Sequence, residues 1–344
     1  MATQTDTTNI AFQLAADFVN YTNSSIFLTG KAGTGKTTFL KYCKENETKN
    51  TAIVAPTGVA AMNAGGTTIH SFFQLPFGAF IPVTKGISSG ENINDKHSLI
   101  SRLRLSNERR EVMQKLDLLI IDEISMVRCD VLDAIDTVLR YVRSQHSRPF
   151  GGVQVLLIGD LYQLPPVIKE EEWKILSPYY KSQYFFNSEV IESQPPVYVE
   201  LDKIYRQSDA AFVDILNQVR NNELNNEGYE LLHRRYLPDF NPGKNENYIT
   251  LTTHNNKADA INIKELNEIK TKGYHFEAMI DGEFYEKSFP ADLSLKLKIG
   301  AQVMFIKNDT EKIRRFFNGK IGIVDKIEDD KIFVRCKDED FPIE

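Results

Sequence analysis

Eight consecutive residues, Gly30 to Thr37, match the pattern G-x-x-x-x-G-K-[ST] at every fixed position. In such a loop the backbone N–H groups close around a pyrophosphate, and a helix that begins there adds the positive end of its dipole. We expect Lys36 to reach the β- and γ-phosphates and the Thr37 hydroxyl to bind Mg²⁺. The predicted nucleotide-binding residues are Gly30, Ala32, Gly33, Thr34, Gly35, Lys36, Thr37 and Thr38. The pattern therefore predicts a nucleoside triphosphate site.

Two carboxylates follow an apolar run further along the chain. Residues 118–121 are consecutive and apolar, as in a strand buried on both faces of a parallel sheet, and Asp122 and Glu123 come directly after them. Carboxylates at the end of a buried strand are costly unless they serve a function. Asp122 is expected to hold Mg²⁺, and Glu123 to accept the proton of an attacking water molecule. Together with the phosphate loop, this pair is typical of an ATPase.

A second apolar run, residues 153–158, leads into the segment Gly-Asp-Leu-Tyr-Gln-Leu-Pro-Pro at 159–166. Its glutamine, Gln163, stands near the carboxyl end of the predicted strand. There it could sense the γ-phosphate and orient water, although a lone glutamine in a loop more often makes ordinary hydrogen bonds.

Two polar segments suit nucleic acid. Pro56, Thr57 and Gly58 form a turn after the apolar run 51–55, and ligands bind at such strand ends in open parallel sheets. Residues 67–73 mix hydroxyls, an imidazole and aromatic rings, a set that suits phosphate contacts and base stacking on single-stranded nucleic acid. Core packing of the two phenylalanines in this segment is an equal alternative.

Alternating apolar runs and helical patterns around these residues indicate an α/β protein. Asp130 is expected to cap the helix that follows the carboxylate pair. Residues 75–107 show no long periodic helix, and the chain past residue 225 is polar. The predicted strands are 25–29, 51–55, 116–121, 153–158, 184–186, 197–201, 248–253, 303–306 and a hairpin of 321–327 with 332–336, and the predicted helices are 10–20, 38–45, 130–142, 209–221 and 256–270.

Length, charge and composition limit the classes of function open to this chain. With 344 residues the chain can hold two or more domains, and a net charge of −6 argues against a uniformly basic nucleic-acid binder, though a local basic groove needs no global charge. The three cysteines show no metal-ligand spacing, and no apolar run is long enough for a membrane span. We therefore expect a cytoplasmic protein that does not bind membranes. Basic residues gather in two regions, which we interpret as solvated faces: Lys96, Arg102, Arg104, Arg109, Arg110 and Lys115, and Lys307, Lys312, Arg314, Arg315 and Lys320.

Several stretches together resemble superfamily-one branch B DNA helicases of the Pif-one group, with RecD as a more distant relative. The matching stretches are 27–37, 55–61, 68–72, 120–126 and 159–167, with weaker matches at 205–207, 252–255 and 300–304. The phosphate loop is shared by many ATPases, whereas Ile-Ser-Met after the carboxylates and the Gln-Leu-Pro-Pro run are far more particular. The resemblance implies an ATP-dependent 5′→3′ DNA helicase.

The resemblance also assigns residues. Lys36, Asp122 and Glu123 keep their predicted roles, Gln163 would couple the γ-phosphate to the DNA site, Tyr205 would stack on adenine, and Arg206 would reach the γ-phosphate from across the cleft. The implied DNA-binding residues are Pro56, Thr57, Gly58, His70, Ser71 and Phe72 on the first motor domain and Thr253, His254 and Asn255 on the second. The implied partners are single-stranded DNA and its junctions with duplex, bound by a monomer.

The fold implied is a P-loop NTPase with RecA-like parallel sheet domains. Residues 1–200 would form the first, with a small wedge insertion at 75–107; residues 201–310 an incomplete second; and 311–344 part of an SH3-like β-barrel. The family's last two motifs have no counterpart before Glu344, so we expect an N-terminal portion of a longer bacterial-type helicase, associated with the nucleoid when on DNA. Roles in DNA repair, recombination and telomere maintenance would follow.

Two alternatives stay open. The absent motifs leave room for a non-catalytic module that binds nucleotide and single-stranded DNA. The second alternative is an ATPase that acts on RNA or in protein remodelling.

Overall fold

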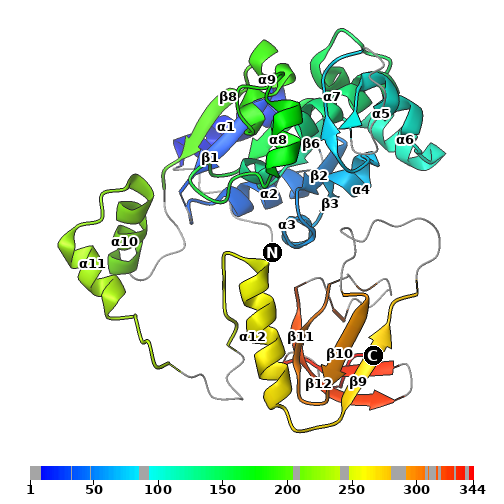
Figure 1. The fold of residues 1–344 in the computed structure, drawn as a ribbon. Coiled ribbons are helices and arrows are strands. Elements are labelled where there is room, and N and C mark those ends of the chain that lie inside the picture. Colours follow the sequence, from blue (N-terminus) through cyan, green and yellow to red (C-terminus); the bar gives the residue numbers. More distant parts are fainter. Residues whose placement is uncertain are drawn as a thin grey trace. The chain divides into compact units, whose positions relative to one another are not determined.

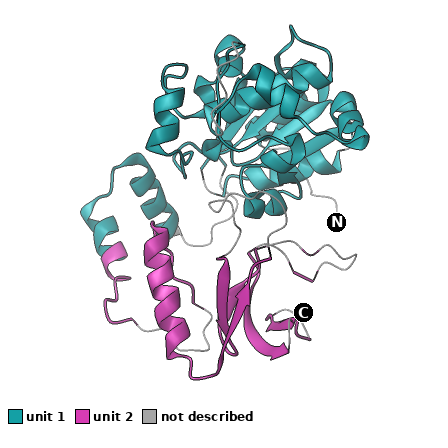
Figure 2. Cartoon of the chain, turned by 45° about the vertical axis from the view of Figure 1, so that its right-hand side comes forward, with its two compact units in different colours: residues 1–231 teal, residues 232–344 magenta. Residues whose placement is uncertain are grey.

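The computed structural model describes residues 9–31, 33–46, 48–84, 93–203, 210–240, 248–279, 292–306, 309, 315–316, 319–328, 331–337 and 341–344. The chain divides into two compact units, Met1–Leu231 and Leu232–Glu344 (Figure 2). Across the described residues, no helix has the length and apolar content that a membrane crossing requires.

A six-stranded sheet in the order β3-β2-β6-β7-β1-β8 forms the centre of the first unit (Figure 1). Every neighbouring pair is parallel, so the carboxyl ends of the strands meet at one edge. This confirms the α/β class and the strands expected near residues 25–29, 51–55, 116–121, 153–158 and 197–201. The strands are β1 (Ile26–Gly30), β2 (Thr51–Ala55), β3 (Thr67–Thr68), β6 (Leu118–Ile121), β7 (Gln154–Ile158) and β8 (Val197–Leu201).

Helices bury both faces of this sheet, which explains the unbroken apolar runs. On β6, Leu118 and Ile120 pack into a cluster with α1 (Ile10–Tyr21) and α2 (Lys36–Glu45). Their neighbours Leu119 and Ile121 point the other way and pack into a cluster with α7 (Cys129–Val142). Because side chains alternate along a strand, one run of four residues supplies two hydrophobic cores.

Further helices complete the first unit, the last of them running across its boundary at Leu231. They are α3 (Gly58–Asn63), α4 (Ile69–Phe73), α5 (Lys96–Arg102), α6 (Asn107–Lys115), η1 (Ile124–Met126), η2 (Pro149–Gly152), α8 (Glu170–Leu176), η3 (Phe185–Asn187), α9 (Glu189–Ser193), α10 (Ala210–Asn221) and α11 (Asn226–His233). The segment past residue 225, expected at the surface, includes the mostly exposed helix α11. The strand expected at 184–186 is wrong, because the amide of Asn187 donates to the Tyr184 oxygen at 3.0 Å in a 3₁₀ turn. That turn buries Phe185 edge-on against Phe27.

The insertion that starts after Leu75 contains two short paired strands, β4 (Ala79–Phe80) and β5 (Ile93–Asn94), before α5. A carboxylate of α7 fixes it: Asp130, fully buried, accepts a hydrogen bond from the Phe80 amide at 3.0 Å and pairs with Arg128. Arg128, rather than Asp130, stands at the N-cap of α7, so the expected cap is wrong. A buried carboxylate requires close partners, and here they come from the insertion and from Arg128.

The second unit joins α12 (Asn255–Glu268) to small antiparallel sheets. β9 (Gly273–Glu277) pairs with β10 (Ser294–Lys298), and β12 (Ile321–Glu328) lies between β11 (Gln302–Met304) and β13 (Lys331–Arg335). The expected hairpin and the helix near 256–270 are confirmed.

Of the two strands expected in a second parallel sheet, one forms in a different sheet and the other does not form. Residues 303–304 belong to β11, which pairs antiparallel with β12. Residues 248–253 adopt no regular strand, and Leu251 in their midst is 88% exposed. Among the described residues, no strand pairs with the backbone of residues 248–253, so their alternating pattern does not become part of a sheet. The three-part division at residues 200 and 310 stays a prediction.

Candidate nucleotide and DNA site

Three neighbouring strands of the sheet end in polar residues at the same edge. β6, β7 and β1 are adjacent, and they lead into Asp122, Asp160 and the phosphate loop. The carboxyl edge of a parallel sheet is where open α/β folds bind their ligands. Residues separated by about a hundred positions in sequence are thereby brought together.

The phosphate loop turns from β1 into α2 with glycine at its last bend. Gly35 has φ +97°, a left-handed conformation that glycine adopts without strain, and Lys36 begins the helix directly after it. Thr37 and Thr38 lie in the first turn of α2, where N–H groups have no helical partner. Thr34 is fully buried and its hydroxyl donates to the Lys31 oxygen at 2.9 Å. Gly30 and Gly33 are part of this turn, and Ala32 lies outside the described residues.

Lys36 folds back onto the loop. Its ammonium group donates to the backbone oxygens of Gly30 at 2.5 Å and Lys31 at 3.0 Å. Burial lowers the pKa of Lys36, and the charges of Asp160, Glu123 and Asp122 act in the opposite direction. The lysine therefore lies within electrostatic reach of all three carboxylates.

The carboxylate pair stands on a sharp turn after β6. Asp122 accepts a hydrogen bond from the Glu123 amide at 3.0 Å, and burial raises the pKa of Asp122 to about 6. Glu123 has φ +52° and ψ +45°, a left-handed conformation that is uncommon for a residue with a side chain. Such backbone outliers concentrate at functional sites.

The segment 159–166 packs against that same turn. A Cβ on Gly159 would lie 2.8 Å from a methyl carbon of Ile124 and 3.0 Å from its amide nitrogen, so only glycine permits this approach. Asp160 follows, 1% exposed, and its carboxylate accepts from the Tyr162 amide at 3.1 Å and from Gln163 Nε2 at 3.0 Å. Gln163 is exposed but held by Asp160.

A further side chain reaches this segment and was not foreseen from the sequence. Arg220, on α10, forms an ion pair with Asp160, and its guanidinium carbon lies 4.3 Å from the centre of the Tyr162 ring. Burial raises the pKa of Asp160, but the hydrogen bonds from Arg220 and Gln163 outweigh it and hold that pKa below its usual range. Arg220 is 60 residues away in sequence, and no local pattern marks it.

The candidate DNA-binding residues of the first unit lie at the same edge of the sheet. Pro56, Thr57 and Gly58 follow β2, and the Thr57 hydroxyl caps α3 by accepting from the Ala60 amide at 3.2 Å. That hydroxyl is therefore engaged within the turn, and Pro56, Thr57 and Gly58 are all half-buried. Thr68 caps α4 in the same way, accepting from the Ser71 amide at 3.3 Å.

α4 divides the predicted contacts between surface and core. Phe73 is fully buried, so the core-packing alternative holds for this ring. Phe72 is partly buried and packs edge-on against Phe73, with ring centroids 4.8 Å apart. His70 stacks on Phe77 with ring centroids 5.5 Å apart. Burial lowers the pKa of His70 and so favours the neutral form of its imidazole.

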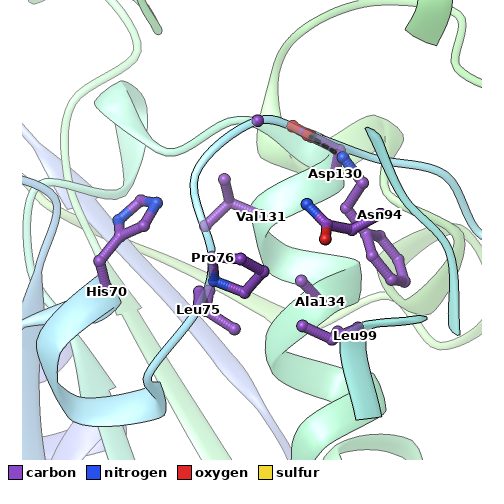
Figure 3. A pocket seen from close by; sticks show the side chains of 10 residues that line it. His70, Leu75, Pro76, Asn94, Leu99, Asp130, Val131 and Ala134 are labelled. Atoms are coloured by element: carbon purple, nitrogen blue, oxygen red, sulfur yellow. Dashed lines mark hydrogen bonds between the residues drawn. The ribbon is translucent and has the colours of Figure 1, made fainter. Parts of the chain in front are cut away.

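His70 also borders a small cavity between α4, the insertion and α7 (Figure 3). Leu75, Asn94, Asp130 and Val131 are among the other lining residues, and the space inside is about 20 Å³, enough for one water molecule. This cavity belongs to the packing of the insertion and is too small for a nucleotide.

The first basic region is partly engaged within the protein. Arg109 donates to the Ser71 oxygen at 2.6 Å, Arg102 to Asn94 at 3.0 Å, and Lys115 pairs with Glu111 at 2.6 Å. Arg109 thereby joins α6 to α4, which a purely solvated face would not do.

The remaining predicted site residues belong to the second unit or are outside the described residues. Thr253, His254 and Asn255 stand exposed at the start of α12 in the second unit, where the Thr253 hydroxyl and His254 Nδ1 are 2.8 Å apart. Tyr205 and Arg206 lie outside the described residues. Whether these five residues join the site of the first unit stays a prediction.

Comparison with known proteins gives consistent matches. The family model described as PIF1-like helicase matches residues 4–230. Human "ATP-dependent DNA helicase PIF1" is 33% identical over 306 residues, which cover 87% of this chain and 44% of that protein. "ATP-dependent DNA helicase Pif1" of Bdellovibrio bacteriovorus is 32% identical over 327 residues, or 90% of this chain and 66% of that protein.

Solved structures match in sequence and in fold. Bacteroides Pif1 bound to single-stranded DNA is 39% identical, with a TM-score of 0.78 over 97% of this chain and 73% of that one. The complex of Bacteroides Pif1 with ADP-AlF3 and single-stranded DNA is 40% identical, with a TM-score of 0.79 over 95% of this chain and 71% of that one. The chain thus spans less than half the length of human PIF1 and about seven tenths of these structures. On the family match, the identities and the shared fold, the chain belongs to the PIF1-like helicases.

Proposed function

We propose that this chain carries the ATP- and DNA-binding machinery of an ATP-dependent DNA helicase that moves 5′→3′ along single-stranded DNA. The observation that carries the proposal is the position of Lys36, on the phosphate loop and within electrostatic reach of Asp122, Glu123 and Asp160. Relatives named as ATP-dependent DNA helicases, and a Bacteroides Pif1 complex with ADP-AlF3 and single-stranded DNA, support it.

Each predicted residue of the nucleotide site has a proposed task. The loop from Gly30 to Thr38 binds the triphosphate, and Lys36 moves from its own loop carbonyls to the β- and γ-phosphates. Glu123 accepts the proton of the attacking water, and Gln163 orients that water against the γ-phosphate. Tyr205 stacks on the adenine and Arg206 adds positive charge as the phosphoryl bond breaks.

Mg²⁺ fits the residues at this edge. The Thr37 hydroxyl and the Asp122 carboxylate are hard oxygen ligands, and Mg²⁺ in nucleotide sites is held by one or two such groups together with phosphates. Burial raises the pKa of Asp122 to about 6, and the charge of Lys36 acts in the opposite direction and favours the ionised form that binds a cation. Bound Mg²⁺ supplies charge neutralisation of the phosphates.

DNA contacts complete the proposed cycle. Pro56, Thr57, Gly58, His70, Ser71 and Phe72 bind the strand on the first unit, and Thr253, His254 and Asn255 bind it on the second. ATP binding and hydrolysis alternately close and open the motor, and the insertion after Leu75 acts as a wedge at the junction with duplex. Opening each base pair costs on the order of 1.4 kcal/mol in stacking, so progress requires coupled ATP turnover. The protein acts as a cytoplasmic monomer at the nucleoid, in DNA repair, recombination and chromosome-end maintenance.

One observation supports a second candidate. The chain spans 44% of human PIF1, and the second candidate is that it binds nucleotide and single-stranded DNA without turning over ATP efficiently. In that case the same residues serve as a binding module.

ATP turnover measured with and without oligo(dT) separates these candidates. The motor predicts stimulation by about tenfold or more, since DNA closes the catalytic arrangement, and RNA of the same length stimulates less. Equal turnover with and without DNA, in a protein that binds both ligands, supports the binding module. Stimulation by RNA alone would instead favour an RNA-dependent ATPase.

A further inference from the structure

Arg220 makes a buried contact that no proposed catalytic step yet uses. Its side chain is 15% exposed, and the partner carboxylate of Asp160 is 1% exposed. The guanidinium group also covers the ring of Tyr162 at 4.3 Å, a cation–π geometry. An arginine this enclosed, paired with a buried carboxylate and stacked on an aromatic ring, is held in one conformation.

The carboxylate of Asp160 organises the turn that presents Gln163. One of its oxygens accepts from the Tyr162 amide at 3.1 Å, and the other accepts from Gln163 Nε2 at 3.0 Å and from Arg220. The Gln163 amide donates to the Asp160 backbone oxygen at 2.9 Å. Both the backbone and the side chain of Gln163 therefore depend on where Asp160 lies.

Removing the arginine would leave Asp160 buried with too few donors. A buried carboxylate without its cationic partner either takes up a proton or turns toward water. Either change breaks the hydrogen-bond set that orients Gln163. Tyr162, 70% exposed despite its cation–π contact, would lose its only described cationic neighbour as well.

We propose that Arg220 is a positioning residue, which fixes Gln163 through Asp160 and Tyr162 and so sets the DNA-stimulated part of ATP turnover. The proposal rests on the proposed function of Gln163. It also gives α10 a role, because this helix follows the segment that carries Tyr205 and Arg206 and contacts the sheet edge through Arg220. A shift of α10 would therefore be transmitted to the γ-phosphate side of the site through the ion pair between Arg220 and Asp160.

Hydrogen exchange on the nucleotide-free protein tests the positioning itself. In R220Q the amides of Tyr162 and Gln163 exchange about tenfold faster or more than in the wild type, because their turn loses its anchor. The matched control is R335Q, which removes an exposed ion pair with Asp325 at 3.1 Å on β12 and β13 and leaves those two amides unchanged. Unchanged exchange at Tyr162 and Gln163 in R220Q overturns the proposal, whether or not the chain hydrolyses ATP.

Steady-state kinetics test the consequence. With oligo(dT), kcat of R220Q falls about 10- to 100-fold while KM for ATP changes less than about threefold, as expected for misplacement of a catalytic group. R220K, which keeps the charge, turns over faster than R220Q. A raised KM with unchanged kcat shows that Arg220 binds nucleotide and overturns the positioning role.

Two further results distinguish failure of this inference from failure of the proposed function. A wild-type chain without DNA-stimulated turnover refutes the proposed function, and the exchange result then decides on Arg220 alone. Should R220Q fail to fold, Y162L removes the cation–π contact and leaves the ion pair, and faster exchange at Gln163 is expected there too. Normal exchange in folded Y162L would then count against the proposal.

Discussion

The ammonium group of Lys36 donates to the backbone oxygen of Gly30 at 2.5 Å, so the lysine of the phosphate loop closes over that loop's first residue. Burial lowers the pKa of Lys36, whereas the neighbouring charges of Asp160 and Glu123 favour its ammonium form. The oxygens of a triphosphate would compete with the Gly30 carbonyl for the same N–H groups. The loop thus keeps its cation desolvated and close to where a γ-phosphate would sit.

Lys36→Ala tests this arrangement. The variant is expected to lose ATP turnover by about 100-fold or more, because one fixed charge on a developing phosphate is worth that much. Binding of oligo(dT), measured by fluorescence anisotropy without nucleotide, should stay within about threefold of the wild type, because the hydrogen bonds of Lys36 to described residues go to its own loop. Lost DNA binding with normal turnover would contradict the role assigned to Lys36.

Glu123→Gln separates binding from chemistry. Glutamine keeps the size of the side chain but cannot accept the proton of the attacking water, so kcat should fall about 100- to 10,000-fold. Binding of a fluorescent ATP analogue should persist, because Lys36 and the loop remain. The control is Glu111→Gln, which removes an exposed ion pair with Lys115 at 2.6 Å and should leave kcat unchanged. Retained turnover in Glu123→Gln would require another base.

The parts of the site that lie in one contiguous stretch could be predicted from the sequence. The phosphate loop, the strands on either side of it and the carboxylates after β6 depend on local patterns: glycine at a bend, four apolar residues in a row, and polar residues where a strand ends. Such patterns need no knowledge of distant contacts. They also predicted correctly that these segments belong to an α/β fold.

The parts that depend on distant partners could not be predicted. Asp130 has the sequence context of a helix cap, but its carboxylate serves the Phe80 amide, 50 residues away. Arg220 is an ordinary helix arginine until α10 brings it to Asp160. Residues 248–253 alternate as a strand does, yet a strand also requires a neighbour to bond with. For Asp130 and residues 248–253 a local pattern was present, and for Arg220 there was none; in all three the tertiary partner decided the outcome.

Asp130→Ala should destabilise the first unit strongly. The change leaves Arg128 and the Phe80 amide without their fully buried acceptor, and removal of one member of a buried ion pair costs about 3–5 kcal/mol. Urea denaturation, followed by circular dichroism, measures the free energy of unfolding. Lys181→Ala is the control, since its exposed pair with Glu192 is worth at most about 1 kcal/mol. A cost below about 1 kcal/mol for Asp130→Ala would mean that the insertion is anchored otherwise.

Asp133 makes the stability of the first unit depend on pH. It is 4% exposed on α7 and accepts from the amides of Glu189 at 2.9 Å and Val190 at 3.0 Å, at the start of α9. Burial raises the pKa of Asp133 to about 7, although those hydrogen bonds act to lower it. An aspartate in the unfolded chain has a pKa of about 4. Between about pH 4 and pH 7 the folded state therefore retains a proton that the unfolded state has released.

The sign of the effect follows from this difference. Folding binds a proton in that window, so the contribution of Asp133 to stability is fully present below about pH 4 and is lost as pH rises to about 7, by at most about 1.4 kcal/mol per pH unit. Asp133→Asn cannot titrate. The free energy of unfolding of the wild type minus that of Asp133→Asn should therefore decrease from pH 5 to pH 7 and stay constant above about pH 7.5.

Urea denaturation at half-unit steps of pH measures this difference, with other titrating groups cancelling between the two proteins. Ser188→Ala is the matched control: it removes the hydroxyl that accepts from the Ile191 amide at the start of the same helix, without removing a titratable group. Its difference from the wild type should not vary with pH. Parallel stability curves for the wild type and Asp133→Asn would show that Asp133 is ionised throughout, and that the two α9 amides outweigh the cost of its burial.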